Sequence, residues 1–271
     1  MVIVMDYLSM NISQFMIYKD YQGFCMEYFE RLPKEGEIIV KVSALNYEIK
    51  DKTVNYVSSN NDNDDDIFDI FIDDFPDPMY YNFTKKCKTI GRFCRIDEDK
   101  IEDIGADYCC GVIAMANVCG GYGFFDKTKN TEIYKAYKKL WSYADVKKVD
   151  GEYAMDQNKI GKAMQKYYKD KTGKTLPYEQ KENPTTQFFI DAVDKKYSSI
   201  LGVYSKREGG KSGHAVSVEG YFIFEPLNEI VYGEKQIFLS VATGWDSEQK
   251  YIWYDKVNLD STYGVVFKLY K

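Results

Sequence analysis

The residues best suited to chemistry in this chain are its cysteines and its single histidine. His214 is the only histidine among 271 residues, and Cys109 and Cys110 stand side by side well before it. An imidazole can take the proton of a thiol, and the resulting ion pair keeps the sulfur as the nucleophilic thiolate. The sequence therefore predicts thiol chemistry, with Cys110 or Cys109 as nucleophile and His214 as the base.

The overall composition excludes several classes of partner. A net charge of -6 and an isoelectric point near 5.1 argue against a nucleic-acid surface and against binding to an anionic membrane. No run of about 18 apolar residues occurs, so we expect no membrane span. Residues 1–6 lack a basic leader, which argues against a signal peptide and slightly favours a cytoplasmic location.

The remaining cysteines and acidic residues give no sign of a metal or cofactor site. The six cysteines are sparse and unevenly spaced, so they indicate neither a disulfide framework nor a set of metal ligands. The acidic run at 60–66 lacks the central glycine and the closing glutamate of a calcium loop, and we interpret it as a solvated loop. We expect no metal and no cofactor.

The elements that must position the cysteine and the histidine fall into two groups. Hydrophobic periodicity predicts four helices and then a series of strands, which together indicate an α+β arrangement with a helical half followed by an antiparallel sheet. The expected helices cover residues 111–119, 129–144, 157–172 and 187–195, and the expected strands cover 199–204, 215–225, 236–242, 250–254 and 264–270, with a glycine-rich basic loop at 206–212.

The N-terminal part of the chain has a different pattern. Residues 1–85 suggest a β-rich region, with strands expected at 37–47 and 52–57, and Pro76 and Pro78 near its end suggest a linker. We therefore predict two domains, at 1–85 and 97–271. The first would serve as a propeptide-like cover or as a recognition domain.

Three segments of the second domain resemble papain-like cysteine peptidases. Cys110-Gly111, with Ala114 and Asn117, is similar to the nucleophile helix of that family. The closest similarity is to the bacterial double-glycine (bacteriocin) leader peptidases. The segment 213–216 around His214 resembles the histidine strand of these enzymes, and the segment 241–246 resembles their third catalytic segment.

The resemblance implies a papain-like fold and a thiol hydrolase that cleaves peptide bonds through an acyl-enzyme, with a peptide or protein as substrate. It implies that Cys110 is the nucleophile, because Cys109 would place a cysteine where the family has glycine. His214 would act as base and then as acid. Gly111, Gly213 and Trp245 would lie along the substrate site.

Two positions depart from the family pattern. Thr243 stands where relatives carry Asn or Asp to orient the imidazole, so Thr243 or Asp246 would take that role, with Asp255 a more distant candidate. Ile104 stands where relatives often carry a glutamine that donates to the oxyanion. These departures leave open a catalytically impaired module that binds peptides or a partner. Two further alternatives stay open: an acyl transferase that uses the same machinery on the same fold, and a structural module whose cysteine and histidine are unrelated.

Overall fold

The computed structural model describes residues 70–72, 81–83, 88–149, 151–207, 210–226, 235–255, 257 and 259–269. The chain divides into two compact units, and nearly all described residues belong to the unit made of Ser58–Phe75 and Asn82–Lys271. The strands expected at 37–47 and 52–57 and the acidic loop at 60–66 lie outside the described residues. The two predicted domains therefore remain a prediction.

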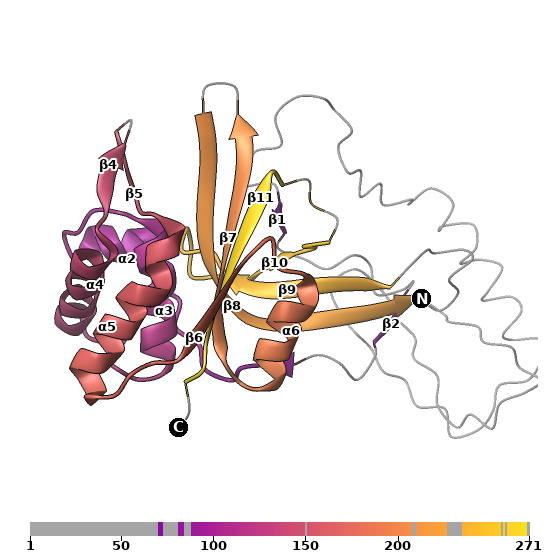
Figure 1. Ribbon diagram of the computed structural model, residues 1–271, viewed down its shortest axis with the longest axis horizontal. Coiled ribbons are helices and arrows are strands. Elements are labelled where there is room, and N and C mark those ends of the chain that lie inside the picture. Colours follow the sequence, from indigo (N-terminus) through magenta and orange to yellow (C-terminus); the bar gives the residue numbers. More distant parts are fainter. Residues whose placement is uncertain are drawn as a thin grey trace, which may run out of the picture. The chain divides into compact units, whose positions relative to one another are not determined.

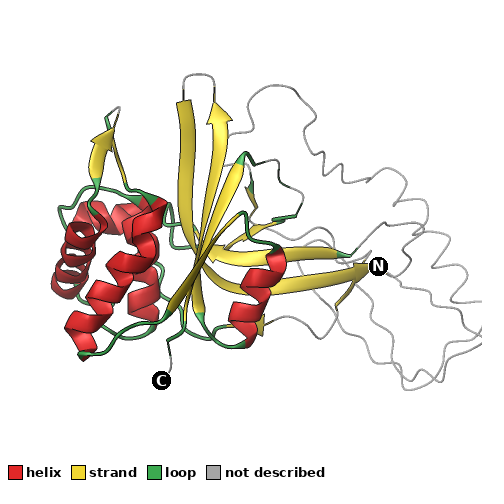
Figure 2. Ribbon diagram, viewed as in Figure 1, coloured by secondary structure: helices red, strands yellow, loops and turns green. Residues whose placement is uncertain are grey.

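The described chain is a mixed helix and antiparallel-sheet structure, which is the predicted α+β class (Figure 2). A helix lies at each of the four ranges that the hydrophobic pattern predicted, as α3 (Cys110–Gly121), α4 (Asn130–Ala144), α5 (Ile160–Thr172) and α6 (Thr186–Asp194). The described residues form two further short helical elements, α2 (Glu98–Asp103) and the 3-10 turn η2 (Gln157–Lys159).

Within the described residues, the main sheet has nine strands in the order β1-β10-β9-β8-β7-β11-β6, with β2 and β3 paired to β8. A separate hairpin joins β4 and β5. The strands are β1 (Phe71–Ile72), β2 (Tyr81–Phe83), β3 (Lys88–Thr89), β4 (Lys147–Val149), β5 (Glu152–Ala154), β6 (Tyr178–Glu182), β7 (Ser198–Arg207), β8 (Gly210–Pro226), β9 (Gln236–Ala242), β10 (Lys250–Ile252) and β11 (Ser261–Phe267).

Helices cover both faces of this sheet, and each face has its own core. The helices α2 to α5 gather beside one part of the sheet, whereas α6 stands apart from them (Figure 1). Side chains alternate between the faces along β8, because successive residues of a strand point to opposite sides. Ala215 packs in the core with α3 to α5, and Val216 packs in the core with α6.

The helix α3 is the central element of the first core. Its residues are small and apolar, and every residue from Gly111 to Gly120 is buried. Such a helix fits between other elements without a polar face, because it meets neighbours on all sides. It packs against β8, α4 and β7.

The sequence analysis missed several short elements. The helix α2, the β4–β5 hairpin and the strand β6 were not expected. The glycine-rich basic loop expected at 206–212 is wrong over most of its length, because β7 extends to Arg207 and β8 begins at Gly210. These residues continue the β7–β8 ladder, in which Lys206 pairs with Lys211 and Arg207 with Gly210.

Asn117 fixes the chain before α2 to the middle of α3. Its Oδ1 accepts the backbone N–H of Ile96 at 2.7 Å, and its Nδ2 donates to the carbonyl of Ile96 at 3.2 Å. Asn117 is 3% exposed, so water cannot replace these bonds. The asparagine of the Cys-Gly motif therefore stabilises the fold at a distance from any reacting atom.

We expect Asn117→Ala to lower the free energy of unfolding by about 1–3 kcal/mol, because it leaves two buried backbone groups of Ile96 without partners. Urea denaturation measures this change. The exposed Ser142, whose hydroxyl donates to the carbonyl of Lys139, provides the control, and Ser142→Ala should cost less than about 0.5 kcal/mol. An equal loss in both variants would contradict the assigned role of Asn117.

Candidate functional site

The backbone at the start of α3 separates the two neighbouring cysteines. Cys109 caps the helix in an extended conformation, with φ -154° and ψ 111°. Since side chains alternate along extended backbone, Cys109 and Cys110 leave the chain on opposite sides. Cys109 is 1% exposed in the core, whereas Cys110 is only partly buried. Of the two, Cys110 is therefore the thiol that a reagent can approach.

The thiol of Cys110 faces the backbone of β8 beside His214. Burial raises the pKa of this thiol, and the hydrogen-bonding N–H groups of Ala215, Gly111 and Cys110 oppose that effect by stabilising the thiolate. Ala215 directly follows His214 in β8. The packing of α3 on β8 therefore brings the predicted nucleophile to the residue next to the predicted base.

Three groups hold the imidazole of His214. Its Nε2 lies 2.8 Å from the carbonyl oxygen of Thr243. Its ring stacks on that of Trp245, with centroids 3.9 Å apart and planes at 16°, and Phe71 meets the ring edge-on at 5.9 Å. His214 is 5% exposed, so these contacts fix the ring in a mostly dry position.

The contact with Thr243 decides which nitrogen of His214 carries the proton. A backbone carbonyl can only accept a hydrogen bond, so Nε2 must be the donor. In the neutral ring, Nδ1 is then unprotonated and can act as a base.

The electrostatics differ from the ion pair that the sequence suggested. Burial lowers the pKa of His214 to about 3, although the hydrogen bond to the Thr243 carbonyl acts in the opposite direction. Because burial also raises the pKa of Cys110, the neutral thiol and neutral imidazole are favoured at pH 7. Across the described residues, no hydrogen bond joins the two side chains.

The candidates for orienting the imidazole occupy different positions. Thr243 contacts the ring through its main chain, while its hydroxyl accepts the N–H of Trp245 at 3.4 Å. The carboxylate of Asp246 binds Lys250 at 3.0 Å and accepts the N–H of Glu248 at 2.9 Å. The carboxylate group of Asp255 accepts the hydroxyl of Thr186. The group that holds the ring is thus a carbonyl, which no side-chain pattern could reveal.

The glycines expected beside a substrate are covered by two larger side chains. A Cβ on Gly111 would lie 2.6 Å from the sulfur of Met155, and a Cβ on Gly213 would lie 2.6 Å from the ring of Tyr204. These glycines therefore allow Met155 to pack closely on α3 and Tyr204 to pack closely on β8. The sequence gave no signal for either side chain, because each lies far from the cysteine along the chain.

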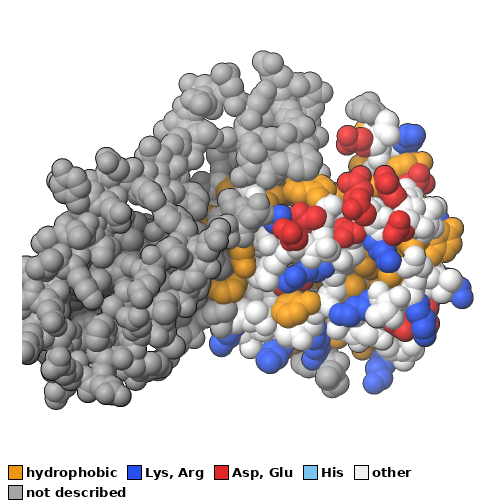
Figure 3. Space-filling view, turned by 180° about the vertical axis from the view of Figure 1, so that it is seen from behind, with side chains coloured by type: hydrophobic (Ala, Val, Ile, Leu, Met, Phe, Trp, Pro, Cys, Tyr) orange, Lys and Arg blue, Asp and Glu red, His pale blue; other side chains and the backbone are white. Residues whose placement is uncertain are grey.

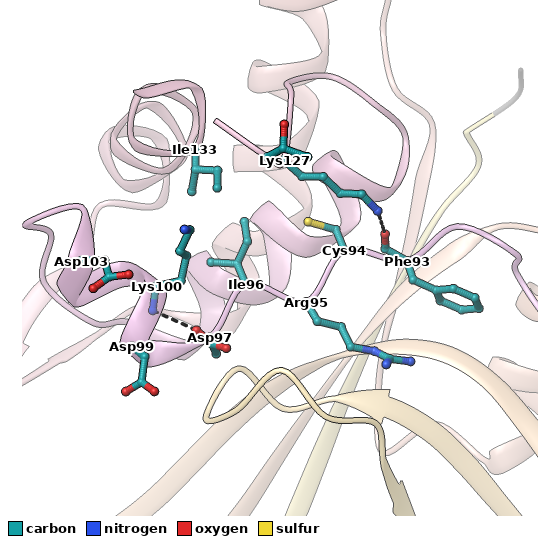
Figure 4. A pocket seen from close by; sticks show the side chains of 11 residues that line it. Phe93, Cys94, Arg95, Ile96, Asp97, Asp99, Lys100, Asp103, Lys127 and Ile133 are labelled. Atoms are coloured by element: carbon teal, nitrogen blue, oxygen red, sulfur yellow. Dashed lines mark hydrogen bonds between the residues drawn. The ribbon is translucent and has the colours of Figure 1, made fainter. Parts of the chain in front are cut away.

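A hollow in the described chain is lined by residues other than those around Cys110 and His214. It measures about 650 Å³ and is bounded by Phe93–Asp97, by α2 and by Lys127 (Figure 4). Three of its charged side chains have structural partners. Asp97 accepts the N–H of Lys100, Lys127 donates to the carbonyl of Phe93, and Arg95 pairs with Glu219 at 2.7 Å. The thiol at its edge, Cys94, is buried, and burial raises its pKa to about 11. This hollow has no group prepared for reaction.

Charge is unevenly distributed over the described surface. Acidic side chains gather in one area of the face seen in Figure 3, with basic side chains beside and below them.

In the described part of the chain, no group of three or more His, Cys, Asp or Glu side chains could hold a metal ion. No described helix is long and apolar enough to cross a membrane.

The sequence matches no protein-family model and no curated protein. Among solved structures, the chain is similar to the active wild-type interpain A cysteine protease of Prevotella intermedia. The similarity has a TM-score of 0.43 and 12% sequence identity, and covers 72% of this chain and 99% of that chain.

The low pKa of His214 gives a prediction for stability. Between pH 6.5 and about 3, the unfolded chain binds a proton on His214 that the folded chain does not bind. This contribution is complete above pH 6.5 and is lost as the pH falls toward 3. Between pH 7.5 and 5, we expect the wild type to lose about 2 kcal/mol more than His214→Phe in urea denaturation.

Because the chain has one histidine, its proton NMR signal is unambiguous. The chemical shift should remain that of a neutral ring down to pH 5. A titration with a midpoint near the ordinary value of 6.5 would show that the imidazole is accessible to water.

Proposed function

We propose that this protein is a thiol hydrolase of the papain-like type, which cleaves peptide bonds through an acyl-enzyme on Cys110. One observation carries the proposal: the Cys110 thiol lies against the amide of Ala215, the residue that follows the only histidine. The hydrogen bond from Nε2 to Thr243 leaves Nδ1 as the base.

The first step joins the sulfur to the substrate. The sulfur of Cys110 attacks the carbonyl carbon of the scissile peptide, a C–S bond forms, and the carbonyl electron pair moves onto oxygen. The thiol proton passes to Nδ1 of His214. Both groups are neutral beforehand, so proton transfer accompanies attack instead of preceding it. We expect a slower reaction than one that starts from a preformed thiolate.

The second step releases the amine. The C–N bond breaks as Nδ1 returns its proton to the leaving nitrogen, which gives a thioester on Cys110. Water then attacks the thioester carbonyl and gives a proton to His214; the C–S bond breaks, and His214 returns the proton to the sulfur, which releases the acid product and restores the thiol. The start of α3 favours negative charge beside the thiol by about 0.3–1 kcal/mol.

Two narrower assignments concern the branch of the family and the fate of the acyl-enzyme. The Cys110-Gly111 segment and the segment around His214 support a peptidase of the double-glycine leader type, and they are the only support for that branch. An amine in place of water in the second step would make the same site an acyl transferase. Nothing in the geometry of Cys110 and His214 favours water over an amine.

One finding favours a second candidate, a module that binds peptides without turnover. The thiol and the imidazole favour their neutral forms and, within the described residues, share no hydrogen bond. Catalytic hydrogen bonds are often long in a protein without substrate and shorten when substrate binds. The two candidates therefore differ in whether substrate brings Nδ1 to the sulfur.

Selective alkylation tests the pairing of thiol and imidazole. We expect iodoacetamide at pH 7 to label Cys110 before Cys94, Cys109 or Cys119, because those three are buried. His214→Ala should slow the labelling of Cys110 by about 100-fold through loss of the base. Peptide mapping by mass spectrometry locates the label, and Cys109→Ser is the matched control.

Hydrolysis of a mixed peptide library then separates the candidates. Cleavage that requires Cys110 and His214 supports the hydrolase. Labelling at the same rate in the wild type and His214→Ala would contradict the proposed pair. Reactive Cys110 with no cleavage would favour the binding module or the transferase.

The role of the Thr243 carbonyl gives a further prediction. Thr243→Val keeps the main-chain group that holds Nε2, so the kcat of peptide cleavage should change less than about 5-fold, well below the loss expected for a catalytic acid–base group. Asp246→Asn should have a similarly small effect, because its carboxylate binds Lys250 and Glu248. A loss of 100-fold or more in either variant would assign the orienting role to that side chain.

A further inference from the structure

The proposed reaction places negative charge on an oxygen beside Cys110, and that charge needs hydrogen-bond donors. Preorganised donors around such an oxyanion are commonly the largest single source of rate enhancement in acyl transfer. The N–H groups at the start of α3 are suited to this role, but no glutamine occurs between residues 23 and 109 to add a side-chain donor. A second donor would then come from another side chain near Cys110.

Tyr108 lies on the same side of the backbone as Cys110. Cys109, between them, is extended, so the side chains on its two sides project together while Cys109 points into the core. The backbone around it is fixed: the N–H of Cys109 donates to the hydroxyl of Tyr137 at 3.1 Å, and that hydroxyl donates to the carbonyl of Asp107 at 2.9 Å. Tyr108 is thus held at a set position relative to the thiol.

The hydroxyl of Tyr108 is buried and has no hydrogen-bond partner among the described residues. A buried polar group without a partner costs about 1–3 kcal/mol, so such a group needs an explanation. Its ring packs, like Cys110, at the edge of the core around α3. An O–H donor without a partner beside a nucleophile is suited to an acceptor that exists only during reaction.

The geometry points to Tyr108 as a catalytic residue whose phenol O–H donates to the oxyanion that forms when Cys110 attacks a carbonyl. This inference rests on the proposed function and adds a residue to it. When the C–S bond forms, the carbonyl electron pair moves to oxygen, the thiol proton moves to His214, and the phenol keeps its own proton while donating a hydrogen bond.

The electrostatics suit a donor of this kind. Burial raises the pKa of Tyr108 far above its ordinary value, and the nearby Cys110 and Glu98 raise it further. The phenol therefore stays protonated at any pH at which the protein works. Its O–H remains a donor and does not become a phenolate that would repel the oxyanion.

The test compares a reaction that forms an oxyanion with one that does not. The p-nitrophenyl ester of an N-blocked glycine acylates a thiol through an oxyanion, whereas iodoacetamide alkylates the thiol by direct displacement. In the full chain, Tyr108→Phe should lower the acylation rate constant by about 100-fold or more, the usual cost of losing one oxyanion donor. Its KM for the ester and its iodoacetamide rate at Cys110 should stay within about 2-fold of wild type, since KM reflects ground-state binding and the alkylation forms no oxyanion.

Tyr167→Phe is the matched control. Tyr167 also has a buried hydroxyl without a partner among the described residues, but its electrostatic neighbours are Cys119 and Glu132, not Cys110. It should leave both rates unchanged. Thermal unfolding should show both variants folded, because each loses a hydroxyl that bonds to nothing in the described chain.

The outcomes distinguish the role of Tyr108 from the proposed function. Equal acylation in wild type and Tyr108→Phe would overturn the role of Tyr108 and leave the proposed function intact. Equal slowing of both reactions would show a structural effect on the thiol and would also overturn it. A wild type with no acylation that depends on Cys110 would contradict the proposed function, and the role of Tyr108 would be rejected with it.

Discussion

The structure of the site depends on the packing of α3 against β8. That contact is possible because α3 is built from small apolar residues and because β8 presents Ala215 to it. The start of the helix thereby meets the backbone of the strand beside His214. Main-chain N–H groups from both elements, Gly111 in the helix and Ala215 in the strand, favour the thiolate form of Cys110.

Main-chain groups take the roles that side chains commonly have at such a site. The carbonyl of Thr243 holds Nε2 of His214, and N–H groups surround the thiol. A carbonyl carries no net charge, so it orients the ring but stabilises an imidazolium less than a carboxylate would. Together with burial, this explains why the neutral pair is favoured. Cys110 and His214 therefore do not form a preformed ion pair.

Burial also explains why the thiols differ in character. Cys94, Cys109 and Cys119 lie in the core, where burial raises the pKa of each. Cys110 shares some of that burial but is partly exposed and receives N–H groups that favour the thiolate. Cys109 and Cys110 are neighbours in sequence but differ in exposure, because extended backbone sends their side chains to opposite sides.

The sequence by itself determined the α+β class, the main helices and most strands of the described part, because hydrophobic periodicity is a local property. It also indicated Cys110 and His214 as candidates, since their types and neighbours are visible in the chain. The tertiary structure alone decided that a carbonyl holds His214, that Met155 and Tyr204 cover the two glycines, and that Asp246 binds Lys250. These contacts join residues far apart in the chain or use backbone atoms common to every residue. No local pattern can encode them.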